Sequence, residues 1–273
     1  MSRIGLTGWQ AWPSRRGKIY VPFGILLPLA LGVTFLFGTI ACQGNPSDYQ
    51  PNTPQNEGTE HSTSTMKDTI AYLALGDSYT IGESVAEADR WPVVLGEALK
   101  EAGYSLEELK IIATTGWTTA ELNEGIASAN VDRKYNLVSL LIGVNNQYRG
   151  PGRGYTLDGY RTEFEDLLQQ AIDFAGSDTS RVFVVSIPDY GVTPFVTNDA
   201  DRERIGQELD AYNAAAKAIC DSHGVKYYDI TPISREAAND LELVATDNLH
   251  PSGKMYRRWV NEVIVPDFIL PLE

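Results

Sequence analysis

The sequence predicts a three-layer α/β/α domain with a parallel sheet, and two features of residues 68–273 predict it. Short apolar runs of the length of buried strands recur along this part of the chain. Between them lie longer segments whose apolar residues repeat every three or four positions, the interval of one helix face. This alternation is typical of strand–helix–strand units, in which helices cover both faces of a parallel sheet.

Five apolar runs are strand candidates, and the segments between them are helix candidates. The candidate strands are Ile70–Leu75, Leu109–Ala113, Leu137–Ile142, Arg181–Ile187 and Lys226–Asp229. The segment from Leu157 to Ala175 keeps the helical interval throughout. A second helix is expected around Cys220, which shares a face with Leu209 and Ala216, so we expect a buried and unreactive thiol there.

A membrane-directed segment is expected in residues 1–41. The stretch 20–41 has no charged side chain and follows Arg15, Arg16 and Lys18. Its end, up to Cys42, resembles a bacterial lipoprotein signal, in which the cysteine becomes the lipidated first residue after cleavage. The alternative is a signal peptide or anchor helix without lipidation. Under either interpretation the upstream positive charges place the rest of the chain on the extracytoplasmic side of a membrane.

Residues 42–67 are expected to form a flexible spacer, because they are rich in Pro, Asn, Gly, Ser and Thr and poor in aliphatic residues. The first 41 residues hold four basic side chains and no acid, so residues 42–273 keep 18 Lys and Arg against 36 Asp and Glu, a formal net charge of −18. Such a charge argues against nucleic-acid binding, which rests on Lys and Arg at phosphates.

Small polar clusters follow each of the first three candidate strands. Ser78 comes two residues after Gly76, Gly116 follows two threonines, and Asn145 lies shortly after Gly143. In open parallel sheets, ligands bind beyond the carboxyl ends of the strands. We therefore expect Ser78, Gly116 and Asn145 to meet at one edge of the sheet.

One histidine fits the role of a base for a serine nucleophile. The chain has three histidines, of which His61 lies in the spacer and His223 at an expected helix end. His250 follows Asp247 by three residues, so a tight loop would let the carboxylate reach the imidazole. Taken singly, Ser78 is a common helix-capping residue and His250 a common surface residue. Together, Ser78, His250 and Asp247 have the residue types of a nucleophile, a base and its orienting acid.

The ordered set resembles the SGNH hydrolases, the GDSL-type esterases and lipases. Residues 73–79 (LALGDSY) resemble the first block of that family, and Asp247–His250 (DNLH) resembles its closing block. Gly116 and Asn145 match the intermediate blocks, and the similarity extends over about residues 69–265. Many members have Asp directly after the Asn, whereas this chain has Asn146, which leaves the amide donor of Asn145 in place.

The resemblance implies a fold, a reaction and a set of roles. It implies a flavodoxin-like sheet of five parallel strands and a serine esterase that forms an acyl-enzyme on Ser78. His250 would be the base and Asp247 its orienting acid. The backbone N–H groups of Ser78 and Gly116 and the amide of Asn145 would form the oxyanion hole. No cofactor and no metal are required, and we expect a monomer.

Aromatic and basic residues at the same predicted edge are candidates for substrate binding. Trp117, Tyr148, Arg149 and Tyr190 are placed to line an acyl or alcohol pocket, and packing inside the domain is the alternative for the aromatic ones. Arg149 would meet a phosphate or carboxylate of the substrate, or else an acid of the protein. Lysophospholipids, short-chain lipid esters and acetylated carbohydrates all fit this description.

Two other functions use the same scaffold. A non-hydrolytic module that binds carbohydrate or lipid at the cell surface would not need the full residue set, which argues against it. An acyltransferase would use the same acyl-enzyme with an alcohol as acceptor, and the sequence leaves this alternative open. A nucleotide-binding domain is disfavoured because neither a G-x-G-x-x-G turn nor a P-loop follows a strand.

Overall fold

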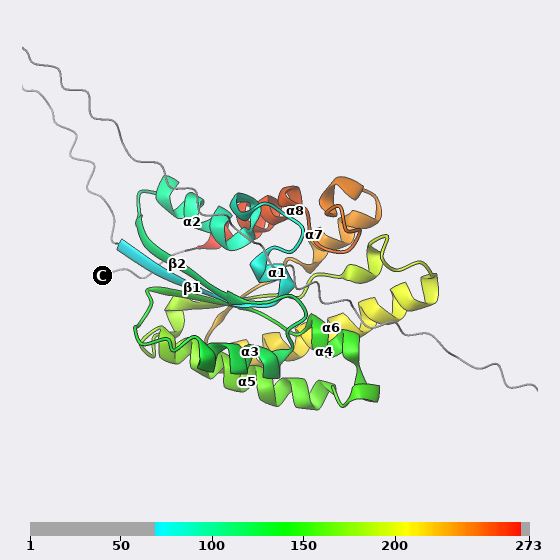
Figure 1. Cartoon of the computed structure of the whole chain (residues 1–273), viewed down its shortest axis with the longest axis horizontal. Coiled ribbons are helices and arrows are strands. Elements are labelled where there is room, and N and C mark those ends of the chain that lie inside the picture. Colours follow the sequence, from blue (N-terminus) through cyan, green and yellow to red (C-terminus); the bar gives the residue numbers. More distant parts are fainter. Residues whose placement is uncertain (1–68, 269–273) are drawn as a thin grey trace, which may run out of the picture. The chain divides into compact units, whose positions relative to one another are not determined.

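A parallel sheet of five strands forms the centre of the described residues, 69–268, in the computed structural model (Figure 1). The strands are β1 (Thr69–Gly76), β2 (Ser105–Ala113), β3 (Leu137–Leu141), β4 (Val182–Val185) and β5 (Lys226–Tyr228), in the order β2-β1-β3-β4-β5. The predicted three-layer α/β/α fold and its five parallel strands are confirmed.

Helices cover both faces of this sheet. In Figure 1, α2 (Trp91–Glu101), α7 (Thr231–Arg235) and α8 (Gly253–Arg258) lie on one face, and α3 (Thr119–Ser128), α5 (Leu157–Phe174) and α6 (Asp199–His223) on the other. The short helices α1 (Ser78–Ile81) and α4 (Val144–Arg149) follow β1 and β3 directly. The remaining helical turns are η1 (Glu87–Asp89), η2 (Pro151–Arg153), η3 (Thr179–Arg181), η4 (Tyr190–Val192), η5 (Glu236–Ala238), η6 (Leu241–Leu243), η7 (Trp259–Ile264) and η8 (Val265–Asp267).

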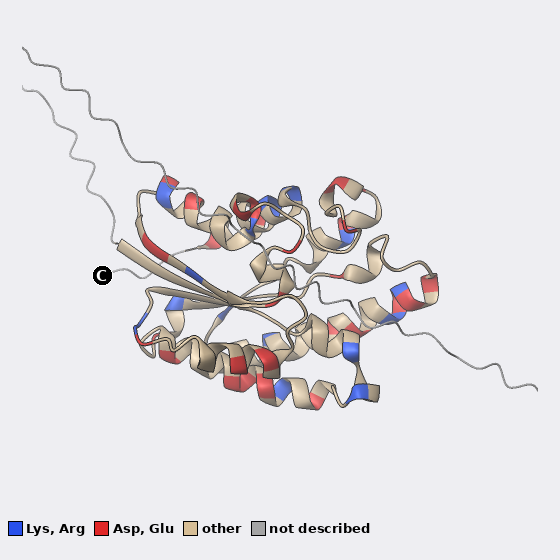
Figure 2. Ribbon diagram, in the orientation of Figure 1, with Lys and Arg blue, Asp and Glu red and all other residues tan. Residues whose placement is uncertain are grey.

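Strand β2 begins four residues earlier than the apolar run that predicted it, at Ser105 rather than at Leu109. The added residues include Glu107 and Glu108, whose charges hide the strand from a search for apolar runs. Charged side chains are tolerated there because β2 is an edge strand and pairs only with β1. Figure 2 shows the resulting contrast, in which β2 carries charged residues and β1 none.

The core forms where apolar faces of the helices meet the sheet. On α5 the buried side chains recur at the predicted helical interval, and Tyr160 packs on Tyr212 of α6 with ring centroids 4.6 Å apart. On the opposite face Trp91 and Trp259 are fully buried. Cys220 is also fully buried, and this burial raises the pKa of its thiol to about 12, so the group is held as an unreactive thiol.

The register of the sheet aligns the ends of its first three strands. Gly76 at the end of β1 lies opposite Ala113 of β2 and Leu141 of β3. The segments that carry Ser78, Gly116 and Asn145 therefore leave the sheet at the same level. This is the edge at which the sequence predicts the functional site.

The segment expected to reach the membrane lies outside the described residues, as do the spacer, His61 and Cys42. Within residues 69–268, none of the helices has both the length and the apolar character needed to cross a bilayer.

Candidate active site

Ser78 is the first residue of α1 and is held at the end of β1. A Cβ atom at Gly76 would lie 2.5 Å from the carbonyl oxygen of Leu141, so only glycine lets the chain turn this close to β3. Asp77 caps the helix by accepting the N–H of Tyr79 at 3.0 Å. The N–H of Ser78, in the first turn, has no intrahelical acceptor and is available for another oxygen.

Asp247 and His250 form a tight loop held by hydrogen bonds. The imidazole Nδ1 of His250 lies 2.5 Å from Oδ2 of Asp247, and Oδ1 accepts the backbone N–H groups of Leu249 and His250, each at 3.0 Å. Asn248 adopts a left-handed conformation (φ 65°), which closes the loop. The arrangement leaves Nε2 as the ring nitrogen that is free to take a proton from a nucleophile.

The loop adjoins the segment that carries Ser78 through two contacts. The ring of Tyr79 packs edge-on against His250, with centroids 5.6 Å apart. The hydroxyl of Ser84 donates to Oδ2 of Asp247 at 2.7 Å, so one carboxylate oxygen is shared by Ser84 and His250. Sequence reasoning missed Ser84, which lies 163 positions before Asp247 and carries no motif of its own.

Hydrogen bonds keep Asp247 ionised in spite of its partial burial. Burial alone would raise the pKa of this carboxyl, but the donors from His250, Leu249 and Ser84 outweigh it and lower the pKa to about 2. The carboxylate can therefore fix the Nδ1–H tautomer of His250 and stabilise the imidazolium when it forms.

Gly116 and Asn145 are linked through the backbone that follows β2. Gly116 has a φ of 89°, a conformation that favours glycine. Asn145 lies in the first turn of α4, directly after the helix cap Gly143, whose φ is 129°. The side-chain amide of Asn145 donates to the carbonyl oxygen of Trp117 at 2.9 Å. An amide nitrogen has two hydrogens, so the second is left for an oxyanion.

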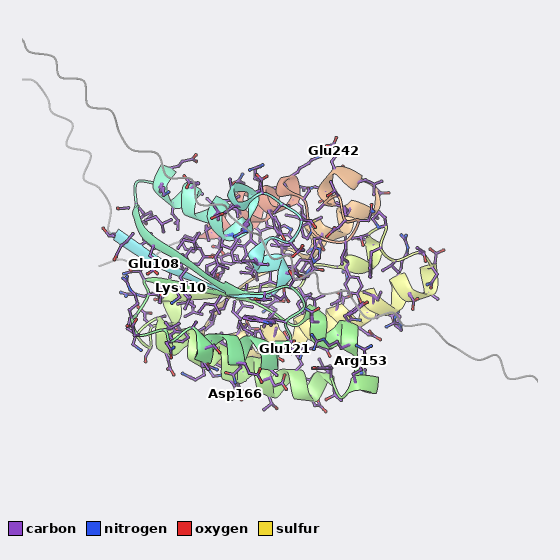
Figure 3. All side chains as sticks on the ribbon, in the orientation of Figure 1. Glu108, Lys110, Glu121, Arg153, Asp166 and Glu242 are labelled. Atoms are coloured by element: carbon purple, nitrogen blue, oxygen red, sulfur yellow. The ribbon has the colours of Figure 1, made fainter. Side chains whose placement is uncertain are left out.

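Arg149, one turn beyond Asn145, fixes the same stretch of backbone. Its guanidinium donates to the carbonyl oxygen of Gly116 at 2.6 Å and pairs with Glu121 of α3 at 2.9 Å (Figure 3 labels Glu121). It also donates to the hydroxyl of Tyr155 at 3.1 Å. Of the two roles that the sequence left open, the structure places Arg149 in an ion pair with an acid of the protein.

Asn146, the residue after Asn145, connects α4 to α3. Its Oδ1 accepts the N–H of Thr119 at 3.1 Å, and its Nδ2 donates to the hydroxyl of Thr119 at 2.6 Å. That hydroxyl in turn donates to Glu163 of α5. A carboxylate at position 146 could not donate and would face the charge of Glu163, so the amide suits these neighbours.

The aromatic candidates lie in two places. Trp117 packs against α3, where a Cβ atom at Gly125 would lie 2.5 Å from its ring carbon Cζ3. Tyr148 is instead 54% exposed, and it contacts the buried Tyr190 with ring centroids 6.1 Å apart. Phe195, in the segment that follows η4, contacts both tyrosines. The aromatic candidates therefore lie in two places: the indole of Trp117 is packed against α3, and Tyr148 and Tyr190 belong to a separate, partly exposed cluster.

Within residues 69–268, no three His, Cys, Asp or Glu side chains come together in a way that could hold a metal ion. His223, the last residue of α6, has its Nε2 atom 3.0 Å from a carboxylate oxygen of Glu165 on α5.

Comparison with protein families gives one match. The description of the matching family is GDSL-like Lipase/Acylhydrolase, and its model covers residues 74–258, which include Ser78, Gly116, Asn145, Asp247 and His250. A search of curated proteins found no match.

Solved structures share the fold at low sequence identity. The esterase EstA from Pseudoalteromonas sp. is 14% identical, with a TM-score of 0.54 over 72% of this chain and 94% of that one. Phospholipase A1 from Streptomyces albidoflavus NA297 is 17% identical, with a TM-score of 0.53 over 71% and 98%. An acetyl xylan esterase from Geobacillus stearothermophilus is 19% identical, with a TM-score of 0.52 over 70% and 91%.

Asp77→Asn should change how stability depends on pH. Asp77 is fully buried, and burial raises the pKa of its carboxyl to about 7, above the unfolded value of about 3.9. The folded wild-type protein therefore loses stability as pH rises from about 4 to about 7, by on the order of 2–4 kcal/mol. The amide keeps the acceptor for Tyr79 but does not ionise, so the stability of the variant relative to the wild type should increase as pH rises over that range.

The measurement is the free energy of unfolding in urea for both proteins at about pH 4.5 and pH 8. The difference between the two proteins isolates Asp77 from the other carboxyl groups. A difference that is the same at both pH values would show that Asp77 is ionised throughout.

Arg149→Met should lower kcat for ester hydrolysis by about 10- to 100-fold with little change in KM. One oxyanion donor is worth about 10²- to 10³-fold in rate, and loosening the backbone around Gly116 removes part of this. Arg153→Met is the control, because it makes the same change in charge at an exposed residue of η2 (Figure 3). A rise in KM alone would instead indicate that Arg149 binds an anionic group of the substrate.

Proposed function

The chain belongs to the GDSL-like lipase/acylhydrolase family, and from this premise we propose that it hydrolyses carboxylic esters through an acyl-enzyme on Ser78. The observation that carries the proposal is the 2.5 Å contact between His250 and Asp247, in a loop that touches the Ser78 segment at Tyr79 and Ser84. This supports a base that is already oriented beside a serine at the edge of the sheet.

In the first half of the reaction, Ser78 attacks the ester carbonyl. Its Oγ forms a bond to the carbonyl carbon while Nε2 of His250 takes the hydroxyl proton, and the negative charge moves to the carbonyl oxygen. The N–H groups of Ser78 and Gly116 and the amide of Asn145 stabilise that oxyanion. The tetrahedral intermediate then collapses, the bond to the alcohol oxygen breaks, and His250 donates its proton to the departing alcohol.

In the second half, water takes the place of the alcohol. His250 accepts a proton from the water as its oxygen attacks the acyl-enzyme, and a second oxyanion forms in the same place. Collapse releases the carboxylic acid and returns the proton to Ser78. Asp247 remains ionised throughout, which is consistent with the low pKa that its hydrogen-bond donors give it.

The names of the solved neighbours include an acetyl xylan esterase and a phospholipase A1, so they cover both sugar esters and lipid esters. At identities below 20% they support the fold and leave the choice of ester to the chain's own residues.

Ser78→Ala should abolish labelling by a fluorophosphonate and lower kcat on a short-chain ester by on the order of 10⁶-fold. The reagent forms a covalent bond to an activated serine, so mass spectrometry of the full-length protein will locate the label. Ser128→Ala is the control, because Ser128 is an exposed serine of α3 whose hydroxyl donates to the backbone of Glu124. Label retained on Ser78→Ala, or activity retained by it, would rule out this mechanism.

We further propose that the enzyme is anchored on the extracytoplasmic side of a membrane through Cys42. Support comes from the uncharged stretch 20–41, the basic residues before it and the lipoprotein-like sequence that ends in Cys42. Residues 42–67 would then act as a tether that lets the domain reach away from the bilayer.

Cys42→Ser should prevent lipidation and shift the protein out of the membrane fraction, with a change in apparent mass. Cys220→Ala is the control, because it removes the other cysteine of the chain and leaves the signal intact. Membrane fractionation and mass spectrometry of the mature protein make the measurement. If Cys42→Ser is processed and fractionates like the wild type, residues 20–41 serve as a signal peptide or anchor helix without lipidation, and the proposed anchoring through Cys42 is wrong.

A further inference from the structure

Three aromatic side chains, two of them exposed, lie together next to the candidate active site, and we call Tyr148, Tyr190 and Phe195 the aromatic shelf. Each ring contacts the other two, with centroids 6.1 to 6.4 Å apart. Tyr148 is 54% exposed and Phe195 is 42% exposed. Isolated exposed apolar residues are common, but adjacent ones beside a catalytic site indicate a binding surface.

Tyr190 is the fixed part of the shelf. It is buried, and its hydroxyl donates to the side-chain oxygen of Gln147 at 2.9 Å. The amide nitrogen of Gln147 donates to Glu208 of α6 at 2.6 Å, and Glu208 pairs with Arg204 at 3.0 Å. This chain of polar contacts holds the ring in place before any ligand arrives, which lowers the entropy cost of binding.

The shelf touches both sides of the catalytic machinery. Tyr148 lies one turn after Asn145 on α4, and Tyr190 lines a small cavity together with Tyr79 and His250. The backbone N–H of Phe195 donates to the carbonyl oxygen of Asn248, in the loop between Asp247 and His250, at 3.0 Å. In Figure 1 α4 and α6 meet at this edge of the sheet. A substrate whose ester is at Ser78 would therefore extend over the shelf.

The charges around the shelf favour a neutral ligand. Residues 42–273 carry a formal net charge of −18. The arginines that flank the shelf already have carboxylate partners: Arg149 pairs with Glu121, and Arg204 pairs with Glu208 and Asp201. A phosphate or carboxylate of a substrate would have to displace one of these pairs and would meet an acidic surface.

The composition of the shelf favours a ring over an alkyl chain. Its three side chains are aromatic, and the other large apolar residues exposed within residues 69–268 are Leu241 and Val265, which belong to other segments. An alkyl chain is best bound in an enclosed apolar pocket, whereas the outer rings of the shelf are open to water. A pyranose ring presents a flat face of C–H groups, which matches the flat face of an aromatic ring, and its hydroxyl groups stay in water.

We propose that the aromatic shelf binds a neutral sugar ring, so that the ester cleaved at Ser78 is an acyl group on a saccharide. This inference rests on the proposed ester hydrolysis and adds to it the alcohol part of the substrate. The sugar ring stacks on Tyr148, the more exposed of the two outer rings, and meets Phe195 at an angle, because the planes of these two rings are 52° apart. Tyr190 packs edge-on against both rings.

The test compares two neutral acetyl esters on the full-length protein. Glucose pentaacetate carries a sugar ring, and vinyl acetate carries the same acyl group without one. Tyr148→Ala and Phe195→Ala should each lower the ratio of kcat/KM for glucose pentaacetate to that for vinyl acetate by about 10-fold, the value of one aromatic contact. Tyr148→Phe, which keeps the ring, should retain most of that ratio.

Val265→Ala is the control, because it removes an exposed apolar side chain from η8. That turn lies at the opposite edge of the sheet, where Asp267 pairs with Lys226 at the start of β5. The control should leave both rates and their ratio unchanged.

Three results would overturn the proposal. An unchanged ratio in both alanine variants would show that the shelf does not bind the sugar. Selective loss of lysophosphatidylcholine hydrolysis in the same variants would assign the shelf to a lipid instead. In both cases Ser78-dependent cleavage of vinyl acetate would leave the proposed function standing. Absence of vinyl acetate cleavage together with an unlabelled Ser78 would overturn the proposed function itself, and the sugar subsite with it.

Discussion

The register of β1 between its two neighbours is the constraint on which the site depends. Parallel hydrogen bonding sets Gly76 opposite Ala113 and Leu141, so that three loops start at one level. Because side chains alternate between faces, a slip of one residue would exchange the side chains of β1 between the two helical layers and move Ser78 away from its partners. The close approach of Gly76 to Leu141 makes this register specific, since a side chain at position 76 has no room.

Two carboxyl groups of the candidate site show how burial and hydrogen bonds together decide the charge of an acid. Asp77 accepts one backbone N–H through Oδ1, while its Oδ2 is buried without a partner, and burial raises its pKa to about 7. Asp247 accepts from two backbone groups, from His250 and from Ser84, and its pKa is lowered to about 2. The difference follows from burial and from the number of donors, because Asp77 is fully buried whereas the side chain of Asp247 is 30% exposed. It assigns the permanent negative charge to the acid that contacts the histidine.

Local patterns predicted the strands and the chemical residues, whereas contacts between distant segments had to come from the structure. Apolar runs predict β1 and β3 because these strands are buried on both faces, but the charges of Glu107 and Glu108 concealed the start of the edge strand β2. Asp247 and His250 were recognisable because their contact spans three residues. The particular partners of Ser84 and Arg149 were not predicted, since they lie 163 and 33 residues away in the chain.

The short helix α4 connects the reaction to the recognition of substrate. Six residues are too few for a helix to be stable alone, so its position depends on its side-chain contacts. Asn145 and Arg149 hold the backbone around Gly116, while Gln147 holds Tyr190 and Tyr148 completes the aromatic shelf. A substitution that alters the contacts of α4 with the backbone around Gly116, or its contacts with the aromatic shelf, shifts the same six residues. Substitutions in the proposed oxyanion hole and in the shelf should therefore be energetically coupled rather than additive, because they share this helix.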